Sequence, residues 1–174
     1  LGGAIALFDG PDSPVTQVFG LGLSQPVTAE LLQSLEDFFT ERGAPTDHDL
    51  SPLGGVPAAA LLARRGYVPI EYSNVLCQSL DGWAPVPAAS GIQVHRVSER
   101  EAGVWAETGA RGWSDVFAFP GLVELNRMIA AREGACCFLA TIGGSPVAAG
   151  ALFVHQRVAL LAGALQHRRH QVGR

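Results

Sequence analysis

Two short apolar segments open the sequence, GAIALFDG (residues 3–10) and VTQVFGLGLS (residues 15–24). In both, apolar residues alternate or cluster between Gly, Pro and Asp, which is typical of strands bounded by turns. Because only PDSP (residues 11–14) separates them, the pattern predicts a β-hairpin.

The hydrophobic period then becomes helical in TAELLQSLEDFFTERG (residues 28–43). Thr28 suits an N-cap and Gly43 a stop. The apolar residues between them recur at helical spacing: Leu31, Leu32, Leu35, Phe38 and Phe39. Shorter signals follow, and they predict a strand in residues 45–53, a short helix in residues 56–66 and a strand in residues 67–80.

A break follows in DGWAPVPAASG (residues 81–91), where small residues and prolines replace any period. This composition is typical of a linker, so we expect one unit in residues 1–80 and a second in residues 92–174.

The second unit begins with a predicted strand, IQVHRVS (residues 92–98). Ser98 followed by Glu101 forms the spacing of a capping box, which predicts a helix start. GLVELNRMIAARE (residues 121–133) predicts another helix, and residues 136–165 predict three strands separated by GGSP and HQR.

Composition indicates a folded protein, with 48% hydrophobic and 16% charged residues. No run approaches the roughly 18 apolar residues of a membrane helix, and the first residues lack the basic flank of a signal peptide. We therefore expect a cytoplasmic protein that does not span a membrane.

Charge is unevenly distributed along the chain. Residues 1–90 carry ten acidic residues against three arginines, whereas residues 91–174 carry six against nine. The last seven residues hold three of these arginines, which suits an anionic partner. Three arginines offer few phosphate contacts and the net charge is −4, so we do not expect nucleic-acid binding.

Three histidines of the second unit, His155, His167 and His170, do not form a metal-binding pattern. The pair His167 and His170 lacks the i, i+4 spacing of one helix face, and no cysteine or acidic residue lies close in sequence. We expect no metal.

The second unit resembles the front of a GNAT-superfamily N-acetyltransferase: one strand, two helices, then an antiparallel meander. The sequence ATIGGSPVAAGALFVHQRVALLAGAL (residues 140–165) is similar to the meander of that family. The first unit resembles the back of the same fold, with a long helix after a Gly-rich strand, a strand, the helix end ARRGY and a final strand. The resemblance implies an α/β (α+β) fold with a mixed, mostly antiparallel sheet flanked by helices.

The order of the units, a back half followed by a front half, resembles tandem GNAT proteins. It leaves two arrangements open. In one, the chain is a piece of a longer tandem protein. In the other, the two halves complete one permuted sheet, with residues 67–80 beside residues 158–165.

The resemblance also implies a bacterial-type enzyme that transfers an acetyl group from acetyl-CoA to an amine, which would be a small molecule or a peptide. Backbone groups on the last strand would hold pantetheine and the acetyl carbonyl: Leu161, Ala162, Gly163, Ala164 and Leu165. The following loop would hold the pyrophosphate, through Arg168, Arg169, His170, Gln171, Val172 and Gly173. Gln171 stands where the family motif has its first Gly, and its side chain obstructs close approach of the backbone.

Catalytic residues are less well defined by the sequence. An amine acceptor must lose a proton, and Glu107 and Asp115 near the predicted helix pair are the candidate bases. The helices around Trp105, Trp113, Phe117 and Phe119 would shape the acceptor site, although aromatic residues of this kind more often belong to the core. The alternative function is a non-catalytic GNAT-like module that binds a ligand or a partner. Unpaired strand edges would favour a homodimer.

Overall fold

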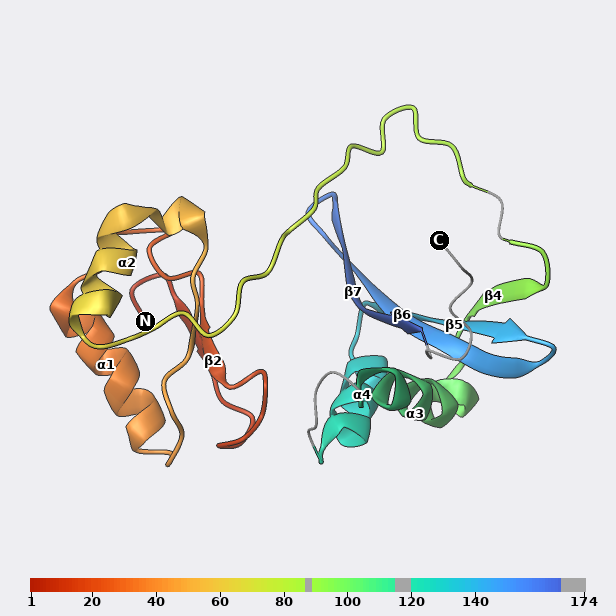
Figure 1. Ribbon diagram of the computed structural model, residues 1–174, viewed down its shortest axis with the longest axis horizontal. Coiled ribbons are helices and arrows are strands. Elements are labelled where there is room, and N and C mark those ends of the chain that lie inside the picture. The colour runs from red at the N-terminus through yellow and green to blue at the C-terminus, as the bar shows by residue number, and fades with distance from the viewer. Residues whose placement is uncertain (87–88, 115–119, 167–174) are drawn as a thin grey trace. The chain divides into compact units, whose positions relative to one another are not determined.

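The computed structural model describes residues 1–86, 89–114 and 120–166 (Figure 1). The chain forms two compact units, Leu1–Ser79 and Leu80–Arg174. Its described strands fall into two separate sheets, one of three strands and one of four. The arrangement in which both halves complete one permuted sheet is therefore wrong.

The first unit is built on a small mixed sheet in the order β1-β2-β3. Strands β1 (Ile5–Leu7) and β2 (Gln17–Phe19) are antiparallel, which confirms the predicted hairpin. Strand β3 (His48–Asp49) runs parallel to β2. Side chains close the hairpin turn, since the Thr16 hydroxyl accepts from the Asp9 N–H at 2.9 Å and donates to the Gly10 carbonyl at 2.7 Å.

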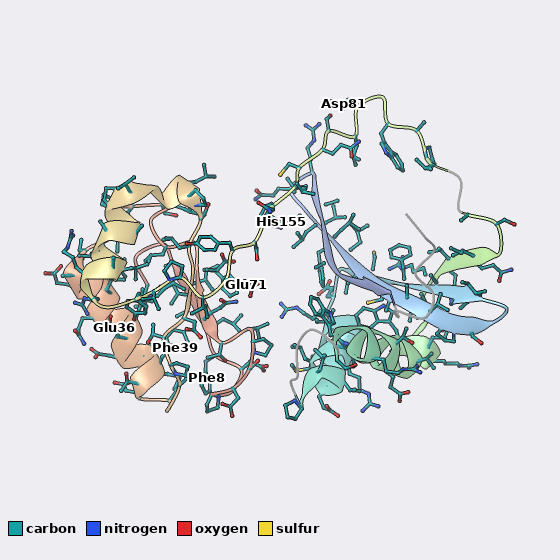
Figure 2. All side chains as sticks on the ribbon, viewed as in Figure 1. Phe8, Glu36, Phe39, Glu71, Asp81 and His155 are labelled. Carbon is teal, nitrogen blue, oxygen red and sulfur yellow. The ribbon has the colours of Figure 1, made fainter. Side chains whose placement is uncertain are left out.

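Two helices cover this sheet. Helix α1 (Ala29–Thr40) begins at the predicted N-cap, where the Thr28 hydroxyl accepts from the Leu31 N–H at 3.2 Å. A 3-10 turn, η1 (Pro52–Gly54), leads into α2 (Gly55–Arg64). The core collects fully buried apolar side chains from α1 and β2, among them Val18, Leu32, Leu35 and Phe39. Figure 2 labels Phe39 on α1. Burial of this apolar face, more than helix propensity, holds α1 in place.

The strand predicted in residues 67–80 is wrong. The structure assigns no strand there, and apolar side chains such as Ile70, Val75 and Leu76 are more than 80% exposed. Alternating apolar residues form a strand only where a neighbouring strand satisfies their backbone N–H and C=O groups. Strand β3 pairs through two residues only, so it offers residues 67–80 a very short edge.

The second unit contains a four-stranded antiparallel sheet in the order β4-β5-β6-β7. Its strands are β4 (Ile92–Arg96), β5 (Ala135–Ile142), β6 (Ser145–His155) and β7 (Val158–Gln166). The sequence predicted all four, including the two turns at GGSP and HQR.

Two helices lie on the same face of this sheet (Figure 1). A 3-10 turn, η2 (Glu99–Glu101), begins with the predicted capping box and continues into α3 (Ala102–Trp113), and α4 (Leu122–Ala131) packs beside it. Their apolar faces meet alternate residues of β5 and β6 in a core that includes Trp105, Ala106, Leu139 and Ala149. The predicted fold class, an α/β protein with a mostly antiparallel sheet flanked by helices, is thus confirmed. Within the described residues, no helix has the length and apolar character needed to cross a membrane.

Candidate functional site

Strand β7 is the element on which the sequence placed the coenzyme, and in the described part of the chain it is an edge strand. It pairs with β6 on one side, from His155 opposite Val158 to Ala148 opposite Gln166. Leu160 and Leu161 are exposed, Leu161 by 77%. The outer N–H and C=O groups of β7 are therefore open to a ligand in the described structure.

An irregularity interrupts the pairing of β6 with β7. Ala151 pairs with Ala162 and Ala149 with Leu165, so one residue of β6 lies opposite two residues of β7, Gly163 and Ala164. Such a bulge leaves backbone groups outside the regular ladder and redirects neighbouring side chains. It falls inside the segment from Leu161 to Leu165, where pantetheine and the acetyl carbonyl were predicted to bind.

Trp105 fixes α3 against the sheet next to this irregularity. Its indole N–H lies 3.1 Å from the Phe138 carbonyl oxygen and 3.2 Å from that of Gly150, the residue of β6 opposite the bulge. Its side chain is 3% exposed. Trp105 thus belongs to the core while one side of it contributes to a cavity.

This cavity lies between α3, α4 and the β6–β7 hairpin and has a volume of about 50 Å³. Most of the described residues that line it are apolar or aromatic: Trp105, Trp113, Ile129, Ala151, Phe153 and Ala162. Ala162 brings the wall of the cavity onto β7 itself. A small group bound there would lie next to the strand predicted to hold the acetyl carbonyl.

Asn126 is the polar side chain of this cavity, and it is 7% exposed. Its Nδ2 donates to the Ala106 carbonyl at 3.1 Å, which ties α4 to α3. No described residue donates a hydrogen bond to its Oδ1. Gly109 permits the close approach of the two helices, because a Cβ at that position would lie 2.9 Å from Asn126 Nδ2.

The structure describes some of the other predicted site residues, whereas others lie outside the described residues. Trp105 and Trp113 line the same cavity, and their place in an acceptor site stays a prediction. Glu107 is exposed and is not among the residues that line this cavity, so its role as a base stays a prediction. Several predicted residues lie outside the described residues: Asp115, Phe117, Phe119, Arg168, Arg169, His170, Gln171, Val172 and Gly173.

Sequence reasoning missed Asn126 and Gly109. A signal for Asn126 was present, because it falls within the apolar stripe of α4 formed by Leu122, Val123 and Ile129. A polar residue in such a stripe is expected to be buried and hydrogen-bonded. Nothing in the sequence indicated Gly109.

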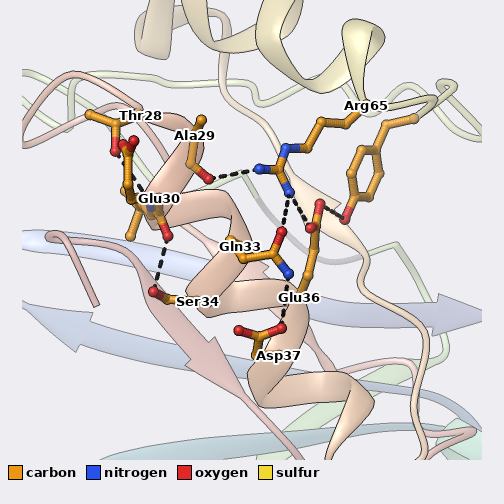
Figure 3. A network of polar contacts seen from close by, with 10 residues as sticks. Thr28, Ala29, Glu30, Gln33, Ser34, Glu36, Asp37 and Arg65 are labelled. Carbon is orange, nitrogen blue, oxygen red and sulfur yellow. Dashed lines mark hydrogen bonds and ion pairs between the residues drawn. The ribbon is translucent and has the colours of Figure 1, made fainter.

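A second polar cluster lies in the first unit, where Arg65 joins α2 to α1 (Figure 3). Arg65 pairs with Glu36 and donates to the Ala29 carbonyl at 2.8 Å and to Gln33 Oε1 at 3.1 Å. The Tyr67 hydroxyl donates to Glu36 at 3.2 Å. Burial, together with the Glu36 charge, raises the pKa of Tyr67 to about 12.

The charges of this cluster are matched, and its Arg65 guanidinium is already used by three acceptors, so the cluster stabilises the packing of α1 against α2. His48 packs edge-on against the Tyr67 ring at 4.9 Å, and its buried ring nitrogens have no hydrogen-bond partner among the described residues. Burial lowers the pKa of His48, which favours the neutral ring. We find no arrangement here that suits acetyl transfer.

The comparisons with known proteins bear on the fold. No family model matches the sequence, and no curated protein matches it. Among solved structures, the chain is similar to a GCN5-related N-acetyltransferase from Kribbella flavida, with a TM-score of 0.73 and 14% sequence identity. The match covers 98% of this chain and 66% of that one. A second structure, from Pyrococcus horikoshii, matches over 52% of this chain and 32% of its own chain with 17% identity. Its TM-score of 0.39 is too low for an inference about the fold.

The chain therefore has the GNAT fold, as its sequence pattern predicted. It spans about two thirds of the Kribbella flavida chain, 66%.

Proposed function

We propose that this chain takes part in acetyl transfer from acetyl-CoA to an amine, with the coenzyme held along β7. The observation that carries this proposal is the juxtaposition in the second unit. An open strand edge with a bulge at Gly163 and Ala164 adjoins a cavity whose wall includes Ala162 of the same strand. A small cavity that adjoins the backbone of β7 supports the proposal, because an acetyl group held on the strand would lie beside it.

The reaction requires little side-chain chemistry. The amine nitrogen forms a bond to the thioester carbonyl carbon, the C–S bond breaks, and sulfur leaves with the electron pair. The proton lost by the amine ends on the thiol. Backbone N–H groups of β7 between Leu161 and Leu165 would stabilise the carbonyl oxygen as negative charge develops on it.

The phosphates would be bound beyond β7. We propose Arg168, Arg169 and His170 as charged contacts to the pyrophosphate and 3′-phosphate, and backbone groups of Gln171, Val172 and Gly173 as further donors.

Calorimetric titration of acetyl-CoA into the 174-residue chain tests this proposal. We expect binding with a dissociation constant on the order of micromolar, weakened when 3′-dephospho-acetyl-CoA replaces it. Replacing both Arg168 and Arg169 by Ala should weaken binding by roughly tenfold or more, given the worth of charge-assisted hydrogen bonds.

The matched control is the double variant Arg100→Ala with Arg132→Ala, because it removes the same two positive charges from exposed positions, one on η2 and one at the end of α4. It should leave the affinity unchanged. An equal loss of affinity in the control would show that the effect depends on the net charge of the chain and not on Arg168 and Arg169.

The alternative is a GNAT-like module that binds a ligand or partner without catalysis. The specific observation in its favour is Gln171, which stands at a position where the family motif has Gly. A chain that unfolds cooperatively but gives no heat with acetyl-CoA would support the module and overturn the enzyme.

A further inference from the structure

The first unit, whose residues are all described, contains a buried histidine that the proposed function does not use. We propose that His48 is a pH-sensitive switch: its neutral ring keeps Tyr67 packed against β3, and protonation of the ring detaches Tyr67 from Glu36. The switch involves residues of the first unit only, so it does not depend on acetyl transfer by the second.

The position of His48 on β3 directs its ring to the core of the first unit. His48 pairs with Val18 of β2, which is fully buried and packs with Leu32 and Leu35 of α1. Directly paired residues of neighbouring strands point to the same face of a sheet. The ring of His48 therefore lies on the side of the sheet that the helices cover.

The ring of His48 is held by packing and not by polar contacts. Both ring nitrogens are buried, and neither has a hydrogen-bond partner among the described residues. A neutral imidazole carries one N–H donor and one acceptor nitrogen. The contact that holds the ring is with Tyr67, whose ring centroid lies 4.9 Å away at an interplanar angle of 77°. This edge-on arrangement is favourable for aromatic rings.

Tyr67 anchors the start of residues 67–80 to the first unit. Its hydroxyl donates to Glu36 Oε1 at 3.2 Å, and Arg65 pairs with the other oxygen of the same carboxylate (Figure 3). Its ring packs against the core, whereas Tyr72, further along the segment, is 86% exposed. Loss of the Tyr67 contacts would therefore free the beginning of this segment.

The charged and titratable groups around His48 come from both helices and from its own strand. β2 contributes none, since its residues are Gln17, Val18 and Phe19. The groups are Glu36 on α1, Arg65 and Tyr67 at the end of α2, and Asp47 and Asp49 beside His48 in the chain. Burial lowers the pKa of His48 below its ordinary value of 6.5, and the charges of Glu36 and Asp47 oppose this effect only in part.

Protonation, by a proton from water, gives the buried ring a second N–H donor and a positive charge. An unpaired buried charge is much less favourable than a buried neutral ring, so the imidazolium needs a carboxylate. Both oxygens of Glu36 already accept a hydrogen bond, one from Arg65 and one from Tyr67. The hydroxyl of Tyr67 is a neutral donor and binds more weakly than the Arg65 guanidinium. Tyr67 is therefore the group that the imidazolium displaces.

The direction of the pKa shift gives the pH range of the switch. Because the pKa of His48 is lower in the folded chain than in the unfolded chain, the unfolded chain binds the proton more tightly. The neutral ring contributes its stability above pH 6.5, the ordinary pKa, and this stability is lost as the pH falls through the lower pKa of the folded state.

The test follows the intact chain by NMR as the pH is lowered from neutral. The Cε1–H resonance of His48 reports protonation, and the ring resonances of Tyr67 report its detachment. The exposed Tyr72 is the second of the two tyrosines in the chain and serves as the reference. We expect His48 to titrate below pH 6.5. The Tyr67 resonances should move towards those of Tyr72 with the same midpoint.

Tyr67→Phe tests the competition for Glu36. This variant keeps a ring against His48 but removes the hydroxyl that donates to Glu36. The vacated oxygen can then accept from the imidazolium, so we expect the pKa of His48 to rise in the variant. A side chain that served only to pack against His48 would not change that pKa through its hydroxyl.

His48→Phe keeps an aromatic ring and removes its protonation. We expect this variant to lose less stability on acidification than the wild type, measured by urea denaturation at a series of pH values. His155→Phe is the matched control, because it makes the same change at an exposed position near the end of β6. It should lose as much stability as the wild type.

Three results would each overturn the switch: a His48 that titrates at or above pH 6.5, Tyr67 resonances that stay in place while His48 titrates, and a pKa of His48 that Tyr67→Phe does not change. Should either variant fail to fold, the titration of the wild-type chain still decides.

Discussion

Two glycines on α3 differ in the space that surrounds them. An added Cβ at Gly109 would lie 2.9 Å from Asn126 Nδ2, whereas nothing lies within 4 Å of one at Gly103. Close packing of α3 against α4, rather than helix propensity, therefore determines the residue at position 109.

We predict that Gly109→Ala lowers the free energy of unfolding by about 1–3 kcal/mol, the usual cost of overpacking. Gly103→Ala should raise it by up to about 1 kcal/mol, because Ala favours the helix. Urea denaturation monitored by circular dichroism measures both. A stabilising Gly109→Ala would mean that α4 does not pack against α3 as described.

At the scale of single residues, the sequence indicated a special role only where the polarity of a residue differed from that of its neighbours on the same helix face. Asn126 is such a residue, a polar side chain inside an apolar stripe. Gly109 looks like any other helical glycine in sequence, because its role depends on a neighbour 17 residues away on another helix.

At the scale of elements, the two hairpins of the second sheet have turns of the same length and backbone conformation but with different residues. Both have two-residue turns, Gly143 and Gly144 in one and Gln156 and Arg157 in the other, and all four residues have positive φ. Such turns match the twist of the strands, but positive φ is unfavourable for residues with a Cβ.

We predict that Arg157→Gly stabilises the second unit by about 0.5–1 kcal/mol, because it relieves a φ of 69° at the β6–β7 turn. The reverse change, Gly144→Ala at the β5–β6 turn, should destabilise it by a similar amount. Thermal unfolding of both variants gives the comparison. Destabilisation by Arg157→Gly would show that the Arg157 side chain contributes more than its backbone costs.

The start of α3 depends on an ionised carboxylate. Glu101 accepts hydrogen bonds from the Ser98 N–H at 2.9 Å and the Ser98 hydroxyl at 2.7 Å, and it lies 2.9 Å from His95 Nε2. The hydrogen bonds from Ser98, with that from His95, lower the pKa of Glu101 to about 2.

Because this pKa is lowered on folding, the capping box contributes its stability above the ordinary value of 4.5 and loses it as the pH falls toward 2. We predict that Glu101→Gln reduces the loss of stability between these two pH values, measured by denaturation at a series of pH values. Glu99 lies two residues before Glu101 in η2 and is exposed, so Glu99→Gln serves as the control. It should leave the pH profile unchanged. Identical profiles for the wild type and Glu101→Gln would contradict this role.

Elements with complete local signals were predicted well, and those that need a partner were not. Thr28 and the Ser98 box each define a helix start through their own neighbours. Residues 67–80 have the alternation of a strand, but alternation says nothing about whether a neighbouring strand is present.

At the scale of the whole molecule, the order of elements in the second unit was enough to predict the GNAT fold, which the likeness to a solved structure supports at 14% identity. The same order left two arrangements of the units open, and the one with a single permuted sheet is wrong, since sheet membership depends on pairing between distant segments. The coenzyme segment was predicted on β7, and the structure adds an open edge and a bulge there.

The most direct test of coenzyme binding on β7 is a ¹⁵N-resolved titration of the chain with acetyl-CoA. The account predicts that the backbone amides of Leu161 to Leu165 shift most among the residues of the described sheet, while core amides of α1 such as Leu32 and Leu35 stay unchanged. Binding that shifts amides of the first unit but leaves Leu161 to Leu165 in place would contradict it.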